Sequence, residues 1–262
     1  MDFLSANLVN TTTQLTVGSG TLTSNFLFAS DPQRQYVTEG FNNDATTASI
    51  TISFDATTSV SRIAMLQTNV KAFDIYYNGV TANAFDITTT GSTITSAFSN
   101  NSETSMYIRT AAVDCTSVTF DLKSTQSANA EKAIGWLAIS NVLLNFEVEG
   151  RLPSAKDYKP LVSPKQVKHM LSDGGARVQT LAEKKSASIK FKNIDKTFRD
   201  KIKTVYDLHG NFIFDSFGTM TGWTDEFIFE CVWPGKFNFF KFSDNAVSAG
   251  FTGQIKLDEV SL

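Results

Sequence analysis

The side chains most often used in catalysis are scarce in this sequence. Its 262 residues include two histidines, His169 and His209, and two cysteines, Cys115 and Cys231. A metal centre or a nucleophile–base pair needs several such groups together. His209 precedes Gly210, and we interpret it as a residue that closes a helix, because an imidazole interacts well with the last helical carbonyls. The sequence therefore predicts no enzyme and no catalytic, cofactor-binding or metal-binding residues.

Carboxylates gather in three places. Asp225 and Glu226 are adjacent, as are Asp258 and Glu259, but neighbours on a strand point to opposite faces and cannot flank one glycosidic bond. Residues 39–44 bring together oxygen ligands that calcium accepts, without the regular spacing of a calcium loop. Ordinary turn chemistry is the better interpretation, with calcium as the minority alternative.

A few aromatic side chains are candidates for stacking on sugar rings, since a flat face with a polar rim suits a pyranose. They are Tyr36, Phe41, Tyr76 and Tyr107. Tyr76 stands out because its neighbours Ile75 and Tyr77 are expected on the inward face. Core filling explains most of the 22 phenylalanines. A single-stranded nucleic-acid binder would intersperse basic residues among its aromatics, and residues 1–150 contain only six, so no nucleic-acid partner is expected.

The composition changes along the chain. Residues 1–150 hold 24 Thr and 17 Ser, with 6 basic and 13 acidic residues. Residues 151–262 hold 7 Thr and 9 Ser, with 17 basic and 13 acidic residues. A surface rich in Thr and poor in Lys suits β-structure. The change predicts two domains that meet near Gly150.

The first domain, residues 1–149, is expected to be an antiparallel jelly-roll sandwich. Apolar and polar residues alternate over 48–55, 60–66, 73–77 and 118–122, and over a long run at 134–148. Such a period of two is typical of half-buried strands. Asn78 and Gly79 add a hairpin turn, and no helical period of any length occurs. Many short alternating strands with polar turns favour a jelly roll.

Residues 150–177 interrupt this pattern. Three of the five prolines, Pro153, Pro160 and Pro164, occur here together with several lysines and arginines. Proline removes a hydrogen-bond donor and is excluded from central strands. The segment is predicted to be a basic arm that contacts an acidic partner, or a solvated linker.

The second domain, residues 178–262, is expected to be α+β, a β-sandwich with one packed helix at about 196–208. Asp195 is a suitable N-cap, apolar residues follow at helical spacing, and Gly210 is expected to supply the left-handed stop. Alternating strands precede and follow this helix.

Nothing in the sequence directs the chain to a membrane. Residues 1–5 contain no basic segment followed by an apolar stretch, so no cleaved secretory signal is expected. No window approaches the roughly 18 apolar residues of a membrane-spanning helix. The two cysteines fall in different predicted domains and are expected to stay reduced, with a disulfide as the weaker alternative.

Several segments of the first domain follow one another in a recognisable order: 28–31 (FASD), 39–47 (EGFNNDATT), 50–55 (ITISFD), 60–63 (VSRI) and 73–79 (FDIYYNG). With 118–123 and 132–137, they resemble the discoidin-like, galactose-binding-like jelly roll. The resemblance implies that fold. The family's bracketing cysteines and the Trp that would follow Thr47 are missing, and the ligand loops of the family vary, so no sugar or calcium residue is transferred.

The second domain, from about residue 182, resembles a different family. Residues 194–210, 211–214 and 223–235 are similar to the sheet-plus-helix body of bacteriophage tail-tip or baseplate proteins of the distal tail type. Such proteins commonly form rings under the tail tube and carry a jelly-roll appendage. The resemblance implies a homo-oligomeric ring, contacts with the tail tube and tail-tip hub, and a place in the virion tail after assembly in the host cytoplasm.

The leading hypothesis is therefore a structural virion protein that forms a ring through its C-terminal domain and displays a jelly roll for protein or glycan contact. The alternative is a carbohydrate-binding, lectin-like module of a bacterial surface or of a tail-like assembly. A hydrolase is the third and least favoured hypothesis.

Overall fold

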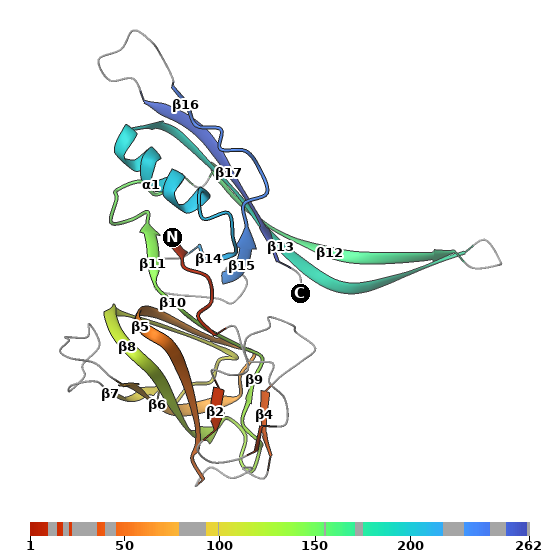
Figure 1. The fold of residues 1–262 in the computed structure, drawn as a ribbon. Helices are drawn as coiled ribbons and strands as arrows, with labels where there is room; N and C mark the ends of the chain where they lie inside the picture. Colours follow the sequence, from red (N-terminus) through yellow and green to blue (C-terminus); the bar gives the residue numbers. More distant parts are fainter. Residues whose placement is uncertain are drawn as a thin grey trace. The chain divides into compact units, whose positions relative to one another are not determined.

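The computed structural model confirms the predicted fold class, which is mainly β with antiparallel sheets and one helix (Figure 1). The structure describes residues 1–9, 15–17, 21–22, 36–39, 46–78, 93–98, 100–154, 156–170, 175–216, 228–241 and 250–260. Over these residues, no helix has the length and hydropathy needed to span a membrane.

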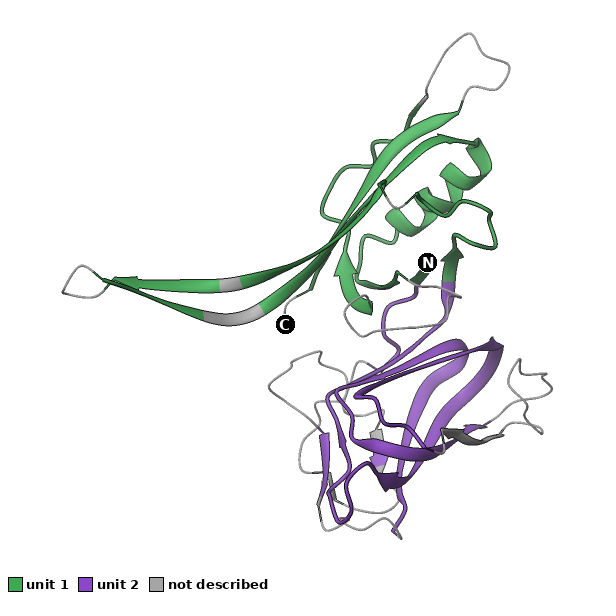
Figure 2. Ribbon diagram, turned by 180° about the vertical axis from the view of Figure 1, so that it is seen from behind, with its two compact units in different colours: residues 1–3, 143–261 green, residues 4–142, 262 purple. Residues whose placement is uncertain are grey.

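The chain forms two compact units that are nested and not consecutive. Unit 1 contains Met1–Phe3 and Leu143–Ser261, and unit 2 contains Leu4–Val142 (Figure 2). The sequence places the boundary after residue 149, with the N-terminus in the jelly roll. In the structure the first strand belongs to unit 1, because Met1 and Phe3 are buried in its core. Three residues are too few for their composition to show which unit they belong to.

Unit 2 is the jelly-roll unit. Its main sheet has the order β10-β5-β8-β6-β7, with β2 paired to β5, and a smaller sheet has the order β3-β4-β9. The strands are β2 (Leu15–Val17), β3 (Thr21–Leu22), β4 (Tyr36–Glu39), β5 (Ala48–Leu66), β6 (Val70–Asn78), β7 (Thr93–Phe98), β8 (Ser105–Thr125), β9 (Ala133–Ile134) and β10 (Trp136–Ser140).

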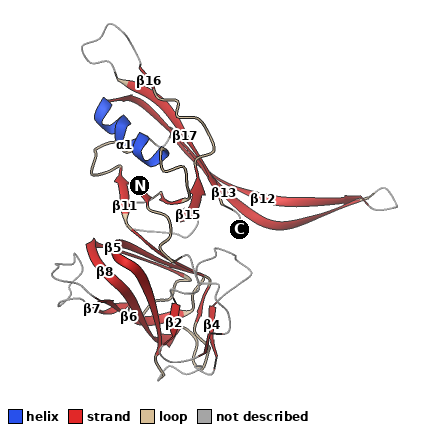
Figure 3. Cartoon of the chain, viewed as in Figure 1, coloured by secondary structure: helices blue, strands red, loops and turns tan. Residues whose placement is uncertain are grey.

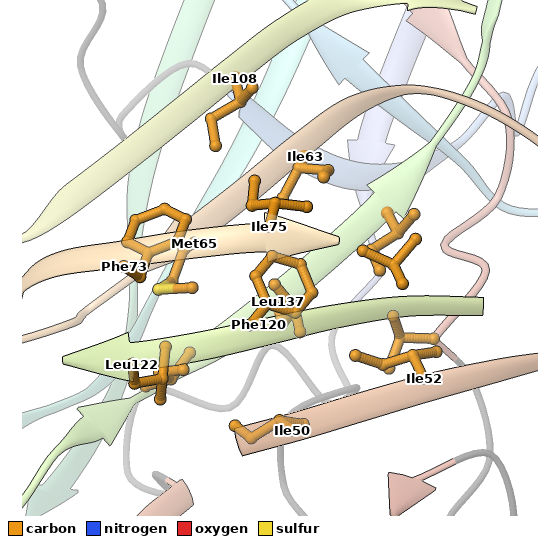
Figure 4. Close-up of a cluster of buried hydrophobic side chains, with 14 of the residues drawn as sticks. Ile50, Ile52, Ile63, Met65, Phe73, Ile75, Ile108, Phe120, Leu122 and Leu137 are labelled. Atoms are coloured by element: carbon orange, nitrogen blue, oxygen red, sulfur yellow. The ribbon is translucent and has the colours of Figure 1, made fainter. Parts of the chain in front are cut away.

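The two longest strands of unit 2, β5 and β8, line its core along both of their halves. Ile50 and Ile52 lie in one half of β5, and Ile63 and Met65 lie in the other, yet all four belong to one buried cluster (Figure 4). The register between β5 and β8 shifts between Ser53 and Thr58. Such shifts allow a strand to bend around a core. The separate strands expected at 48–55 and 60–66 are thus one bent strand.

Unit 1 is an α+β unit. Its sheet has the order β11-β1-β14-β15-β17-β13-β12, with β16 paired to β17. The strands are β1 (Asp2–Leu4), β11 (Val142–Asn145), β12 (Tyr158–Met170), β13 (Ala176–Ile194), β14 (Phe212–Asp215), β15 (Ile228–Val232), β16 (Phe240–Lys241) and β17 (Phe251–Glu259). The strand expected at 134–148 is divided among β9, β10 and β11.

The single helix, α1 (Lys196–Tyr206), packs its apolar face into the unit 1 core through Phe198, Ile202 and Val205. Asp195 is the N-cap as predicted, and its side chain accepts a hydrogen bond from the Phe198 N–H. The predicted stop at Gly210 is wrong. The left-handed residue is His209, with φ 48°, and its ring packs against Tyr206 at 5.3 Å between centroids.

The segment expected to be a basic arm contains the first strand, β12, of a long β-hairpin. β12 and β13 pair from Tyr158 to Met170 on one strand, and their outer halves extend beyond the neighbouring strands of unit 1 (Figure 3). Pro160 and Pro164 lie in β12, which is the last strand of the sheet order. An edge strand tolerates proline because one side of its backbone has no ladder to join.

Both cysteines are buried and free, Cys115 in unit 2 and Cys231 in unit 1. This confirms the expectation that they remain reduced. Burial raises the pKa of the Cys115 thiol to about 11 and that of Cys231 well above its usual value. Neither thiol is therefore an activated nucleophile.

Candidate functional site

The four aromatic candidates differ in how far the structure buries them. Tyr36 is fully buried in the unit 2 core, so its assignment as a stacking residue is wrong. Phe41 lies outside the described residues. Tyr107 is half-buried, and the guanidinium of Arg109 lies 4.8 Å from its ring centroid. Tyr76 is partly exposed like Tyr107, and it remains the candidate because its hydroxyl bonds to a carboxylate, Asp74.

Tyr76 lies on the outward face of β6. Ile75 and Tyr77 on either side are buried in the core, as the alternation predicts. Their side chains point inward, so Tyr76 points away from the core. Burial of Ile50 and Ile52 in β5, and of Phe120 in β8, fixes the outward residues of those strands in the same way.

The strand register brings a set of polar side chains beside Tyr76. Tyr76 is opposite Thr119, which is opposite Thr51. The next row along the strands contains Asp74, Asp121 and Ser49. Hydroxyls, carboxylates and one phenol thus share the outward face of three adjacent strands. We call these residues, with Lys123 and Asn78, the Tyr76 face.

Hydrogen bonds connect the members of the Tyr76 face. The Tyr76 hydroxyl donates to Asp74 Oδ2 at 3.3 Å, and Ser49 Oγ donates to Asp121 Oδ1 at 2.5 Å. The Thr51 and Thr119 hydroxyl oxygens are 2.8 Å apart. Asn78 Nδ2 donates to Thr119 Oγ1 at 3.3 Å. These contacts fix the side chains in place before any ligand arrives.

The two carboxylates form an unfavourable pair. Asp74 and Asp121 lie directly opposite each other on adjacent strands, and like charges in that position destabilise a sheet. Lys123 offsets part of this cost through an ion pair with Asp74, at 2.6 Å between Nζ and Oδ2. Burial, together with the charges of Asp121 and Asp74, raises the pKa of Tyr76. The phenol therefore stays neutral and keeps its proton for donation.

This arrangement suits a neutral polyhydroxyl ligand. A tyrosine ring offers a flat apolar surface with a polar edge. Carboxylate oxygens accept hydrogen bonds from hydroxyl groups, and the threonine and serine hydroxyls both donate and accept. We assign no reaction to this arrangement.

The other candidate groups belong to unit 1 or lie outside the described residues. His169 is in β12 and His209 follows α1, both in unit 1. Glu259 Oε2 accepts a hydrogen bond from the backbone N–H of Lys185 at 2.7 Å, which gives it a structural role. Asp225 and Glu226 lie outside the described residues, as do residues 40–44 of the segment 39–44, for which calcium is the minority alternative. Within the described part of the chain, no three His, Cys, Asp or Glu side chains are placed to hold a metal ion.

Sequence reasoning identified Tyr76 and missed its partners. The alternation of apolar and polar residues assigns Asp74, Asp121 and Thr119 to outward faces. It says nothing of which strand lies next to which. The register between β6 and β8, which sets the carboxylates opposite each other, becomes visible only in the folded sheet.

No family model matches the sequence, and no curated protein matches it either. Solved structures with a similar chain course include carbohydrate-binding modules. Chitosan-binding module 1 of a chitosanase/glucanase from Paenibacillus sp. IK-5 is 10% identical, with a TM-score of 0.38 over 52% of this chain and 97% of that one. A family 32 module from C. perfringens in complex with galactose is 12% identical, with a TM-score of 0.38 over 53% and 99%. Chitosan-binding module 2 of the Paenibacillus enzyme, in complex with chitotriose, is 13% identical, with a TM-score of 0.38 over 51% and 98%.

Proposed function

We propose that the protein is a lectin-like, carbohydrate-binding component of a larger assembly, and that the Tyr76 face is its glycan site. The observation that carries the proposal is the carboxylate pair Asp74 and Asp121 beside the Tyr76 ring. Folding alone does not favour two opposed carboxylates, and violations of local design rules concentrate at functional sites. A sugar would stack on the ring and donate a hydroxyl proton to Asp121, which is partly exposed, because the Asp74 side chain is buried and paired with Lys123.

Titration of the full chain with galactose and with chitotriose tests this function. These are the ligands named for two of the structural neighbours, and a glycan array extends the search. We expect Tyr76→Ala to weaken binding about tenfold or more, as the loss of an aromatic contact of about 1.4 kcal/mol implies. Asp121→Asn, which preserves the shape but removes the charge, should weaken it as well.

Tyr107→Ala is the matched control, because it removes a half-buried tyrosine of the same unit whose ring lies beside Arg109. This variant should bind sugar as the unaltered chain does. Absence of binding across the array, or equal binding by the Tyr76→Ala variant, would contradict the proposal. Melting curves of all variants separate loss of the site from loss of the fold.

The second candidate function is that of a structural virion protein in a bacteriophage tail, assembled as a ring through unit 1 and joined to the tail tube and tail-tip hub. The extended hairpin of β12 and β13 favours it, since a two-stranded ribbon is marginally stable in water by itself. Electron microscopy of the purified chain tests this function. Closed rings support it, and a monodisperse monomer at high protein concentration contradicts it.

A further inference from the structure

Hydroxyl groups form a row across four strands of the unit 2 main sheet. Thr16 in β2 is opposite Thr51 in β5. Thr51 is opposite Thr119 in β8, which is opposite Tyr76 in β6. Residues that lie directly opposite each other in a sheet share one face, so all four side chains belong to the outward face. We call these four residues the hydroxyl row.

The hydroxyl row is accessible along its length. Thr16 is exposed, and the other three members are partly exposed. The second half of β5 differs, because its outward residues Arg62, Ala64 and Leu66 are all buried. On β5, the accessible part of the outward face is therefore the half that carries the row.

The hydroxyls of the row keep hydrogen-bonding capacity for a ligand. A threonine hydroxyl can donate once and accept twice. Thr51 and Thr119 share one hydrogen bond, at 2.8 Å between their oxygens, and Thr119 also accepts from Asn78 Nδ2 at 3.3 Å. A donor and further acceptor positions of this pair thus remain for the hydroxyl groups of a sugar.

The spacing of the row matches that of a sugar chain. Neighbouring strands lie about 4.8 Å apart, so the four members span about 14 Å. One pyranose of an extended, equatorially linked chain advances by nearly the same distance as one strand. A chain that lies across the strands would therefore place successive residues beside successive members of the row, starting with a ring stacked on Tyr76.

The two sides of the row differ in their chemistry. On one side lies Asp121, which is partly exposed. On the other side Asn78 Nδ2 donates to Ser117 Oγ at 2.8 Å. Because Asp74 is paired with Lys123, Asp121 leaves the Tyr76 face with a net negative charge. The face therefore suits a chain without acidic substituents.

We propose that the hydroxyl row binds an extended, uncharged, linear oligosaccharide of about four residues, which lies across the strands from Tyr76 to Thr16. The inference rests on the proposed glycan-binding function and deepens it, because it distinguishes a stretch of sugar chain from a single terminal sugar. A monosaccharide would contact Tyr76 and Asp121. Each further residue would reach one more threonine of the row.

Titration of the full chain with oligosaccharides of increasing length tests the proposal. The probes are N-acetylated chito-oligosaccharides and β-linked galacto-oligosaccharides, each from the monosaccharide to the tetrasaccharide. In at least one series we expect affinity to rise about tenfold or more over this range, because each added residue gains hydrogen bonds. Equal affinity for the monosaccharide and the tetrasaccharide would overturn the extended site and leave the proposed function intact. Absence of binding at every length in both series would contradict the proposed function as well.

Variants along the row locate the chain. Valine replaces the threonine hydroxyl with a methyl group, so each variant should lose about threefold in affinity. Thr51→Val should show this loss from the trisaccharide onward, and Thr16→Val should show it with the tetrasaccharide alone. Tyr76→Ala should weaken binding at every length. A chain that followed the strands would not reach Thr16, so unchanged tetrasaccharide binding by Thr16→Val would overturn the proposal.

Thr57→Val is the matched control. Thr57 is an exposed threonine of β5, in the stretch where the register with β8 shifts, and its variant should bind every length as the unaltered chain does. An equal loss in Thr57→Val and Thr16→Val would overturn the proposal. Melting curves of all variants separate loss of the row from loss of the fold.

Oxidised sugars test the preference for an uncharged chain. Galacto-oligosaccharides whose C6 atoms are oxidised to carboxylates should bind at least about tenfold more weakly than the unoxidised chains, because like charges repel at Asp121. Asp121→Asn should reduce this difference. Equal binding of oxidised and unoxidised chains by the unaltered protein would overturn this part of the proposal.

Discussion

Unit 2 and unit 1 have similar apolar cores but different surfaces. Each buries an extensive core rich in aromatic and β-branched residues. Unit 2 surrounds its core with hydroxyls and carboxylates, and its described residues include no exposed large apolar side chain. Unit 1 leaves apolar residues exposed, among them Leu161 and Val178 on the hairpin and Leu208 after α1. The contrast teaches that the two proposed functions draw on different surfaces, glycan binding on the polar face of unit 2 and assembly on the apolar residues of unit 1.

The two units also differ in how the chain builds them. Unit 2 comes from one continuous segment, while unit 1 needs both ends of the chain. Phe3 is the clearest link, because its ring packs 4.9 Å from that of Phe146, 5.3 Å from that of Phe212 and 5.7 Å from that of Phe214. The β1 strand thus ties residues that are more than a hundred positions apart in the sequence.

The largest expected effect comes from Phe3→Ala. Removal of a fully buried phenylalanine ring costs about 3–5 kcal/mol, which is a large part of the stability of a typical domain. We expect the amide protection of the unit 1 strands in hydrogen–deuterium exchange to fall while that of unit 2 is unchanged.

The matched control is Phe120→Ala, which empties a fully buried position in the unit 2 core. It should lower protection in β5, β6 and β8 and leave the unit 1 strands as they are. If Phe3→Ala instead weakened unit 2, the nested division of the chain would be contradicted.

Much of this fold follows from the sequence, for physical reasons that differ between elements. The period-two pattern identifies β6, because Phe73, Ile75 and Tyr77 face one core. The N-cap and apolar spacing identify α1 within two residues. β1 was missed because three residues carry no measurable period. The hairpin was missed because prolines argue against a central strand and give no indication that the chain forms an edge strand.

The candidate site was predictable to a smaller extent. Sequence alone ranks Tyr76 above Tyr36 only through the apolar neighbours of Tyr76. Tyr36 is buried in the core, and it lies opposite Ile134 where two short strands, β4 and β9, pair. These two positions are about one hundred residues apart in the sequence. Partners across strands depend on register, and register depends on the whole sheet.

Alkaline pH is expected to have an intermediate effect on the stability of unit 2. Burial raises the pKa of Tyr36 to about 12 and also raises that of Tyr77. Below pH 10 these phenols are neutral in both the folded and unfolded chain. As the pH rises above 10, the unfolded chain ionises first, so the free energy of unfolding of unit 2 falls progressively towards pH 12.

Denaturant unfolding of unit 2 at pH 9, 10, 11 and 12 measures this decline. Tyr36→Phe should make it shallower, and at neutral pH should cost little, because the Tyr36 hydroxyl has no hydrogen-bond partner within the described residues. Tyr206→Phe, in α1 of unit 1, is the control and should leave the unit 2 profile unchanged. A Tyr36→Phe profile identical to that of the unaltered chain would show that Tyr36 does not contribute to the alkaline loss.

The smallest expected effect concerns the start of α1. The described residues of unit 2 form no helix, so this effect is confined to unit 1. The Asp195 carboxylate accepts a hydrogen bond from the Phe198 N–H and forms an ion pair with Arg151. The Phe198 N–H is the main cause of its lowered pKa, followed by Arg151. Asp195→Ala removes both contacts and should destabilise unit 1 by about 1 kcal/mol, which hydrogen exchange in α1 and its neighbours would report.

Asp195→Asn separates the two contributions, because asparagine also caps helices well but carries no charge. We expect it to retain most of the stability at neutral pH. The lowered pKa of Asp195 means that its ionised form contributes stability at pH values above the usual carboxyl pKa, and this contribution is lost as the pH falls through the folded-state pKa. The asparagine variant should lack that acid dependence. If the alanine and asparagine variants were equally destabilised, the ion pair with Arg151 would outweigh the cap, contrary to the small value expected of an exposed pair.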